Sequence, residues 1–167
     1  MIETLTREHR FIEYLESIAW NRGVMDVLAL GLGKPPGSVA EMYPYVSLWT
    51  NRGANPIYRD TCFLIAALFA YHPSVTRDGN FGEHLARACN GGEENTAVER
   101  RLTELLSARY GDLSVLLRQS LDLLKKRDVA VNWEQLFGDL LSWEHPDADV
   151  QKAWAKSFWE VRSAVSA

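Results

Sequence analysis

The chain has 167 residues, of which 47% are hydrophobic and 24% are charged, and its formal net charge is −4 at pH 7. This length and composition are typical of a soluble globular protein with one domain or two small helical lobes, whose core needs no disulfide or metal. The acidic balance argues against a protein that coats nucleic acid unaided, so contact with a polyanion would have to come from a local basic surface or from an assembly.

Apolar residues at helical spacing predict helices along the first half of the chain. Pro35 and Pro36 forbid a continuous helix between residues 31 and 37, because proline lacks an amide hydrogen. Asn55 followed by Pro56 is a strong helix start, with the asparagine as N-cap. The helices predicted before residue 92 cover residues 6–22, 24–30, 39–42, 46–49, 56–71 and 81–89.

The second half of the chain also has helical spacing. No run alternates with period two for long enough to predict a strand, so the predicted fold class is all-α. Short connections favour an N-terminal helical lobe, residues 1–91, followed by a C-terminal antiparallel four-helix bundle, residues 92–167, with the loop 73–79 as an alternative boundary. The residues predicted to begin the last four helices are Thr96 (in a capping box with Glu99), Asp112, Asn132 and either Asp147 or Asp149.

The sequence contains no membrane-spanning or secretion signal. The longest apolar run, Cys62–Tyr71, has ten residues, against the roughly 18 that a membrane-spanning helix needs. The N-terminus lacks the basic and then apolar pattern of a secretion signal, which favours a cytoplasmic location. The two cysteines, Cys62 and Cys89, are predicted to be buried, reduced thiols.

No motif for catalysis or cofactor binding is recognisable. The run GLGKPPG at 31–37 has neither the preceding strand nor the glycine spacing of a nucleotide-binding loop. The four histidines are scattered without metal-ligand spacing, and no Gly-x-Ser-x-Gly pattern marks a nucleophile. We therefore predict no catalytic residue, no metal site and no cofactor, and expect that the protein is not an enzyme.

The most distinctive feature is a local excess of basic residues in an acidic protein. Residues 100–127 contain seven basic and three acidic side chains, a balance of +4. On leucine-rich helices this excess favours contact with a polyanion, of which nucleic acid is the commonest. The ordinary alternative is that these side chains solvate the outer helix faces and pair with Glu or Asp. The seven are Arg100, Arg101, Arg109, Arg118, Lys125, Lys126 and Arg127.

The tryptophans admit two interpretations, stacking on bases or packing in the core. Trp133, Trp143 and Trp154 fall on apolar helix stripes, which favours the core. Trp49, beside the loop Asn51–Gly53, is the one for which stacking stays open.

Several segments, in conserved order and spacing over most of the chain, resemble the CasB family, the small subunit of the type I-E CRISPR surveillance complex called Cascade. The resemblance implies a two-lobed, all-helical, non-enzymatic subunit. It also implies contact with other Cascade proteins, guide RNA, target DNA and a second copy of the same chain. The function that it implies is to stabilise the separated strands of the R-loop without reading their sequence. The segments that carry it are LGKPPG at 32–37, YPYV at 43–46, FLIAALFA at 63–70, LARA at 85–88, ERRL at 99–102, Arg109, LLRQ at 116–119, VNW at 131–133, DLLSW at 139–143, Val150-Gln151 and Trp154-Ala155.

The resemblance also nominates residues for contact with the nucleic-acid backbone. It implies phosphate contacts at Arg87, Arg101, Arg109 and Arg118, with Arg100, Lys125, Lys126 and Arg127 as weaker candidates and Arg22, Lys34, Arg59 and Arg77 as additions from the first lobe. Relatives tend to carry an arginine pair where this chain has Ala29 and Leu30, so a contact of the first lobe is missing there. The alternative function is a helical protein–protein adaptor that does not touch nucleic acid.

Overall fold

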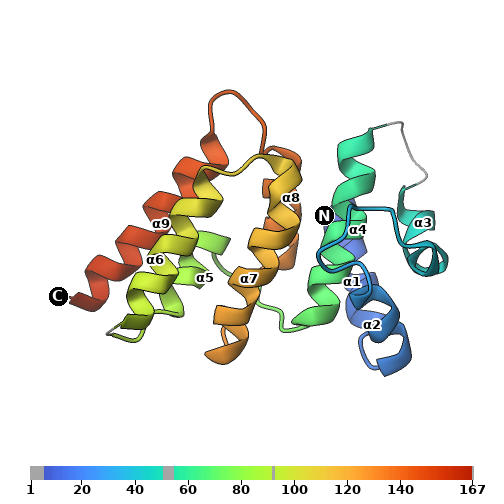
Figure 1. The fold of residues 1–167 in the computed structure, drawn as a ribbon, viewed down its shortest axis with the longest axis horizontal. Coiled ribbons are helices and arrows are strands. Elements are labelled where there is room, and N and C mark those ends of the chain that lie inside the picture. The colour runs from blue at the N-terminus through green and yellow to red at the C-terminus, as the bar shows by residue number, and fades with distance from the viewer. Residues whose placement is uncertain (1–5, 51–54, 92, 167) are drawn as a thin grey trace, which may run out of the picture. The chain divides into compact units, whose positions relative to one another are not determined.

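The computed structural model describes residues 6–50, 55–91 and 93–166. The chain divides into two compact units, Met1–Pro73 and Ser74–Ala167 (Figure 1). Each unit is built from helices, and the only β-type pairing among the described residues is an isolated parallel bridge between Val75 and Val131. The predicted all-α class is confirmed.

The first unit begins its helices where the sequence offers side-chain caps. The hydroxyl of Thr6 accepts a hydrogen bond from the amide of His9, and Asn55 caps the amide of Ile57 with Pro56 at the first helical position. Both satisfy amides that a helix start leaves without partners. The helices of this unit are α1 (Arg7–Ile18), α2 (Arg22–Ala29), the 3-10 helix η1 (Ala40–Met42), α3 (Tyr43–Thr50) and α4 (Pro56–Tyr71).

Helix α4 forms the centre of the first unit. Its residues 61–69 are all buried, and α2 and α3 pack against it. Helix α1 adds Phe11, Ile12 and Leu15, which are completely buried. The hydroxyl of Tyr14 donates to the carbonyl of Tyr45 at 2.7 Å, which ties α1 to α3.

The second unit contains α5 (Phe81–Arg87), α6 (Glu93–Leu106), the 3-10 helix η2 (Tyr110–Asp112), α7 (Leu113–Lys126), α8 (Trp133–Leu141) and α9 (Asp149–Ser166). The division after Pro73 falls at the alternative boundary, the loop 73–79, and not at 91–92, because α5 packs along α9 and contacts α6 and α7. The predicted four-helix bundle therefore gains a fifth helix, and Arg77 belongs to the second unit instead of the first lobe.

Two predicted helix starts need correction. Helix α6 begins at Glu93, so Thr96 lies inside the helix and does not cap it. Asp112 stands at the N-cap position of α7, but its side chain makes no capping hydrogen bond. The side chain of Asn132 does cap α8, by accepting from the amide of Gln135 at 3.2 Å.

Three tryptophans form the core of the second unit, as predicted. The rings of Trp143 and Trp154 lie 4.9 Å apart, and Phe81 of α5 lies 5.3 Å from Trp154. Each indole N–H has an acceptor, as a buried tryptophan requires: Trp133 donates to the carbonyl of Ser74, Trp143 to that of Ala108, and Trp154 to the carboxylate of Asp139.

Among the described helices, none combines the length and the hydropathy needed to cross a bilayer. Both cysteines are free thiols, with Cys62 buried and Cys89 half-buried. Burial raises the pKa of the Cys62 thiol to about 12.

His84 joins α5 to the start of α8 and is almost completely buried. Its Nε2 accepts a hydrogen bond from the amide of Asn132 at 3.0 Å, so the ring proton belongs on Nδ1 and the neutral ring is the form that fits. Burial, with a smaller contribution from the charge of Arg87, lowers the pKa of His84 to about 4. The folded protein therefore resists protonation at this residue.

We expect acid to destabilise the second unit through His84. Below its ordinary pKa of about 6.5 the unfolded chain takes up a proton that the folded chain takes up only near pH 4, so stability present above pH 6.5 is lost as the pH falls through this window. Between pH 7.5 and 5.0 the free energy of unfolding should fall by about 2 kcal/mol more in the wild type than in His84→Gln. Urea unfolding at the two pH values measures this difference.

Burial raises the pKa of Asp139, which changes stability in the opposite direction. Because Asp139 is present in both proteins, the comparison with His84→Gln isolates the histidine. An equal loss in the two proteins would contradict the assignment.

Candidate nucleic-acid interface

Helix α6 presents Arg100 on the side opposite to its buried stripe. Val98, Leu102 and Leu105 face the core, and a rotation of about 100° per residue places Arg100 on the outer face. Its side chain is exposed and forms no ion pair with any described residue. The guanidinium group is therefore available to an external anion.

Arg101 is held between α6 and α7. Its Nη1 donates to Glu104 at 2.6 Å and to Gln119 of α7 at 2.7 Å, and only 25% of the side chain is exposed. Its charge is already balanced by a carboxylate, and it connects two helices. A substitution of Arg101 would change the packing as well as the charge.

Helix α7 carries its basic residues on more than one side. Leu117, Leu121 and Leu124 face the core. Arg118 and Lys125, seven residues apart, share one side of the helix, about 100° away from Gln119, the residue that meets Arg101. Arg118, Lys125 and Lys126 are exposed and Arg127 is half-buried, and all four interact with other groups of the protein.

Arg109 projects from a firmly held turn between α6 and η2. On one side of it, the carbonyl of Ala108 accepts from the indole of Trp143 at 2.9 Å. On the other side, the amide of Tyr110 donates to Glu144 at 2.7 Å. The exposed side chain of Arg109 forms no ion pair with a described residue, so a fixed backbone presents an available guanidinium group.

Three other predicted contacts pair with carboxylates. Arg87 lies 2.7 Å from Glu83 on α5, Arg59 lies 3.5 Å from Asp60 on α4, and Arg77 lies 3.8 Å from Glu134 on α8. Exposed pairs of this kind contribute little stability. A phosphate could therefore replace the carboxylate at modest cost.

Arg22 and Lys34 lie on the first unit, both exposed. Arg22 is the first residue of α2, and Lys34 follows Gly33, whose φ of +73° forms the turn after α2. Leu30 is 46% exposed as an apolar side chain. The first unit thus carries one exposed cation at the start of α2 and another beyond its end.

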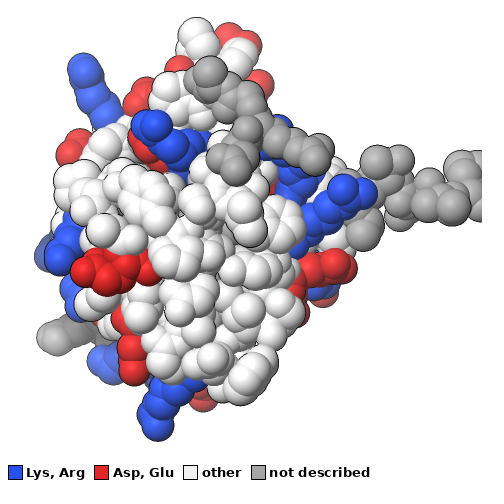
Figure 2. Space-filling view, turned by 90° about the vertical axis from the view of Figure 1, so that its right-hand side faces the viewer, with Lys and Arg blue, Asp and Glu red and all other residues white. Residues whose placement is uncertain are grey.

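Figure 2 views the molecule from the side on which α3 lies in Figure 1. The centre of this face is uncharged, and Lys and Arg side chains lie separately around its margin, several beside Asp or Glu. On the described part of this face they form no continuous basic strip.

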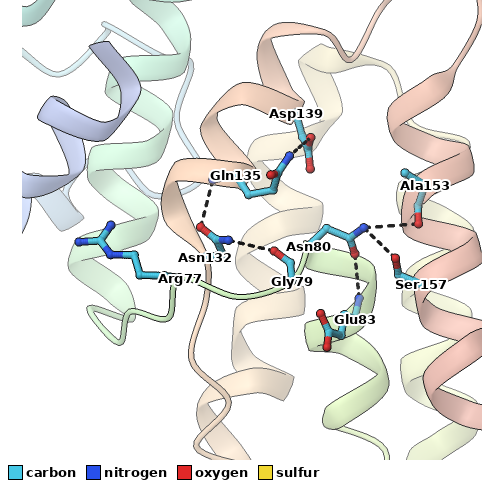
Figure 3. Close-up of a pocket in the computed structure, with 9 residues that line it drawn as sticks. All are labelled: Arg77, Gly79, Asn80, Glu83, Asn132, Gln135, Asp139, Ala153 and Ser157. Atoms are coloured by element: carbon cyan, nitrogen blue, oxygen red, sulfur yellow. Dashed lines mark hydrogen bonds between the residues drawn. The ribbon is translucent and has the colours of Figure 1, made fainter. Parts of the chain in front are cut away.

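A polar cavity of about 350 Å³ in the second unit looks at first like a ligand site (Figure 3). Asn80 donates to the carbonyl of Ala153 and to the hydroxyl of Ser157, and it caps the amide of Glu83. Gln135 donates to Asp139 at 2.9 Å. Asp139 also accepts from the indole of Trp154 on α9, and Asn132 donates to the carbonyl of Gly79 before α5. These bonds join α5, α8 and α9, and they do not present an aligned nucleophile and base.

A second cluster is fully on the surface. His145, Asp147 and Asp149 bring ligand atoms within 4.8 Å of one another, and all three are exposed. The amide of Asp147 donates to Nδ1 of His145 at 3.2 Å, so that nitrogen already has a partner.

The sequence-based prediction missed two arginines, Arg7 and Arg10 of α1. Together with Tyr14 they recur at i, i+3 and i+7, which places them on one helix face. They line a cavity of the first unit that also contains Trp49 of α3. The helical spacing of the three residues is the signal that could have found them.

These features define an all-helical protein of two units whose available arginines lie on outer helix faces and in a rigid turn. The chain belongs to the family described as CRISPR-associated protein Cse2, whose model matches residues 27–159.

Individual relatives agree with this family. A CRISPR-associated protein Cse2 of Thermus thermophilus is 29% identical over 156 residues, covering 90% of this chain and 88% of that protein. The crystal structure of CasB from M. ruber has a TM-score of 0.82 at 23% identity and covers 98% of each chain. A chain in the structure of a CRISPR RNA-guided surveillance complex has a TM-score of 0.78 at 18% identity, with 96% of this chain and 95% of that chain covered.

Proposed function

We propose that this protein is a non-enzymatic subunit of a type I-E CRISPR surveillance complex, in which it binds the backbone of the separated DNA strands without sequence preference and stabilises the R-loop. Membership of the Cse2 family over residues 27–159 is the observation that carries this proposal. The likeness in fold to a chain of a CRISPR RNA-guided surveillance complex supports it.

The energetics of R-loop formation suit such a protein. Exchanging a DNA duplex for an RNA–DNA heteroduplex is nearly balanced, so contacts to the backbone can decide the outcome. The guide supplies the sequence specificity, and contacts to phosphates carry none. The proposed phosphate ligands are three exposed arginines: Arg100 on α6, Arg109 in the turn between α6 and α7, and Arg118 on α7.

The remaining surface suits contact with other proteins. A net charge of −4 favours docking against basic neighbours that carry nucleic acid. The first unit also exposes several large apolar side chains, which are common where proteins meet: Trp20, Leu30, Tyr43 and Leu48. The proposed partners are other Cascade proteins, guide RNA, target DNA and a second copy of this chain, in the cytoplasm.

The proposal that the protein is not an enzyme is supported by its polar cavity. There the side chain of Asn80 donates to Ser157, and the carboxylate of Asp139 accepts from both Gln135 and Trp154. A catalytic carboxylate or base would need an open partner at hydrogen-bond distance from a substrate.

A second candidate is a protein–protein adaptor that does not touch nucleic acid. Ion pairs with neighbouring carboxylates favour this function, because such pairs are also common on helix surfaces that only face solvent. The arginines that form them are Arg59, Arg77, Arg87 and Arg101.

Reconstitution separates the two functions. Adding this chain to a type I-E complex that lacks its small subunit should restore assembly and lengthen the R-loop lifetime about tenfold or more, equivalent to about 1.4 kcal/mol. Size-exclusion chromatography measures assembly, and dissociation of labelled target DNA measures the lifetime. Assembly without any change in lifetime would favour the adaptor, and failure to assemble would contradict both.

A further inference from the structure

The first unit contains a cavity of about 510 Å³ between α1, α3 and α4. None of the basic residues predicted from the sequence is among its described lining residues. A volume of this size is within the range of pockets that hold a small ligand. We call this cavity the Arg–Trp pocket. The described residues that line it are Arg7, Arg10, Tyr14, Leu48, Trp49 and Tyr58.

The aromatic side chains of the Arg–Trp pocket are rigidly held. The ring centres of Tyr14 and Trp49 lie 5.2 Å apart, and those of Trp49 and the buried Phe11 lie 5.6 Å apart in a T-shaped arrangement. The hydroxyl of Tyr14 donates to the carbonyl of Tyr45 at 2.7 Å, and burial raises the pKa of Tyr14, so the phenol keeps its proton. A preformed aromatic wall of this kind can receive a flat ligand without first being ordered.

The charged side chains among the described residues of the lining are two arginines. The carboxylate of Glu8, next to Arg7 in α1, also acts on Tyr58. Arg7 places its guanidinium carbon 4.2 Å from the centre of the Tyr58 ring, a cation–π contact. Arg10 is exposed and forms no ion pair with a described residue. No acidic side chain is among the described residues of the lining, whereas Glu83 and Asp139 line the polar cavity of the second unit.

A ligand that matches this pocket combines a flat aromatic face with an adjacent anion. A nucleotide does so through its base and its phosphate, and stacking of bases on aromatic side chains is independent of sequence. We propose that the Arg–Trp pocket receives one unstacked base of a single strand, with the base against Trp49 and the flanking phosphate at Arg10. The choice of a nucleic-acid ligand rests on the function proposed above, but the site lies on different residues.

Binding of the full-length protein to two DNA probes tests this proposal. The probes are a 20-nucleotide oligo-dT and an oligonucleotide of the same length made of abasic sites, which keeps the phosphates and removes the bases. We expect oligo-dT to bind about 5- to 100-fold more tightly. Trp49→Leu should reduce the ratio towards one with little effect on the abasic probe, and Trp20→Leu, which changes a tryptophan that is 82% exposed and outside the pocket, should leave the ratio unchanged.

Arg10→Gln provides a variant that cannot disturb the core, because Arg10 is exposed. It should weaken the binding of both probes by the same factor and lower the salt dependence of log affinity by about 0.7. Ultraviolet cross-linking of an oligonucleotide that contains 5-bromodeoxyuridine, followed by mass spectrometry of peptides, should recover Trp49 or Tyr14.

The outcomes distinguish this proposal from the function on which it rests. Equal affinity for oligo-dT and the abasic probe, or a cross-link outside the pocket, overturns the base site but leaves backbone binding intact. Failure to bind either probe at low salt, by the protein alone and by the reconstituted complex, contradicts the proposed function itself. Stronger competition by an acidic peptide containing tyrosine than by oligo-dT would make the pocket a protein-docking site and also overturn the proposal.

Discussion

Replacing Arg109 and Arg118 by alanine is expected to weaken retention of target DNA by the reconstituted complex about 30-fold, because each guanidinium group would lose a charge-assisted bond to a phosphate. Both side chains are exposed, one in the turn before η2 and one on α7. Neither contributes to the buried stripes of the helices, so the free energy of unfolding should change by no more than about 0.5 kcal/mol.

The salt dependence of binding identifies the mechanism of this loss. Contacts between protein cations and phosphates release counterions, and each contact with a single strand contributes about 0.7 to the slope of log affinity against log salt. The double variant should therefore have a slope smaller by about 1.4 in magnitude. Filter binding between about 50 and 200 mM salt measures it.

Lys152→Ala with Lys156→Ala is the matched control. Both lysines are exposed on α9, and their removal subtracts the same formal charge. If the two double variants lose equal affinity, the effect belongs to net charge and not to a site on α7 and the adjoining turn. If neither loses affinity, the phosphates are bound elsewhere.

The features that could be predicted from the sequence, helix starts and the apolar stripes of helices, depend on residues close together in the chain. Asn55 with Pro56, and Asn132, begin helices because an N-cap side chain bonds to an amide only two or three residues away. The apolar stripes placed Trp133 and Trp154 in the core for the same reason, because helical spacing is a local property.

Contacts between distant residues could not be predicted in this way. The membership of α5 in the second unit depends on its packing against α9, more than sixty residues later in the chain. The tie between Arg101 and Gln119 and the positions of Arg7 and Arg10 around Trp49 also depend on tertiary packing. A count of basic residues therefore indicated the surface of α6 and α7 but did not separate available arginines from paired ones.

Gly82→Ala should be the most damaging small substitution in the second unit. A Cβ at this position would lie 2.1 Å from the carbonyl oxygen of Trp154 and 2.7 Å from its Cα, both backbone atoms of α9. Because a helix backbone cannot move aside as a flexible side chain can, α5 and α9 would have to separate, and the free energy of unfolding should fall by about 3 kcal/mol or more. Urea unfolding monitored by circular dichroism measures this loss.

Gly138→Ala makes the same chemical change where there is room. Gly138 lies inside α8, and apart from its chain neighbours and the nearby backbone of α8 itself no atom lies within 4 Å of its added Cβ. Alanine should therefore stabilise the protein by about 0.5–1 kcal/mol through its higher helix propensity. A loss of unfolding free energy for Gly82→Ala and a gain for Gly138→Ala would locate the constraint in the contact between α5 and α9.

The same pair of variants tests whether α5 supports the proposed DNA-binding surface. Since α5 also packs against α6 and α7, Gly82→Ala should weaken DNA retention although it removes no charge, whereas Gly138→Ala should not. Similar small effects from both substitutions would mean that α5 can leave α9 without cost, and the arginines of α6 and α7 would then need another support.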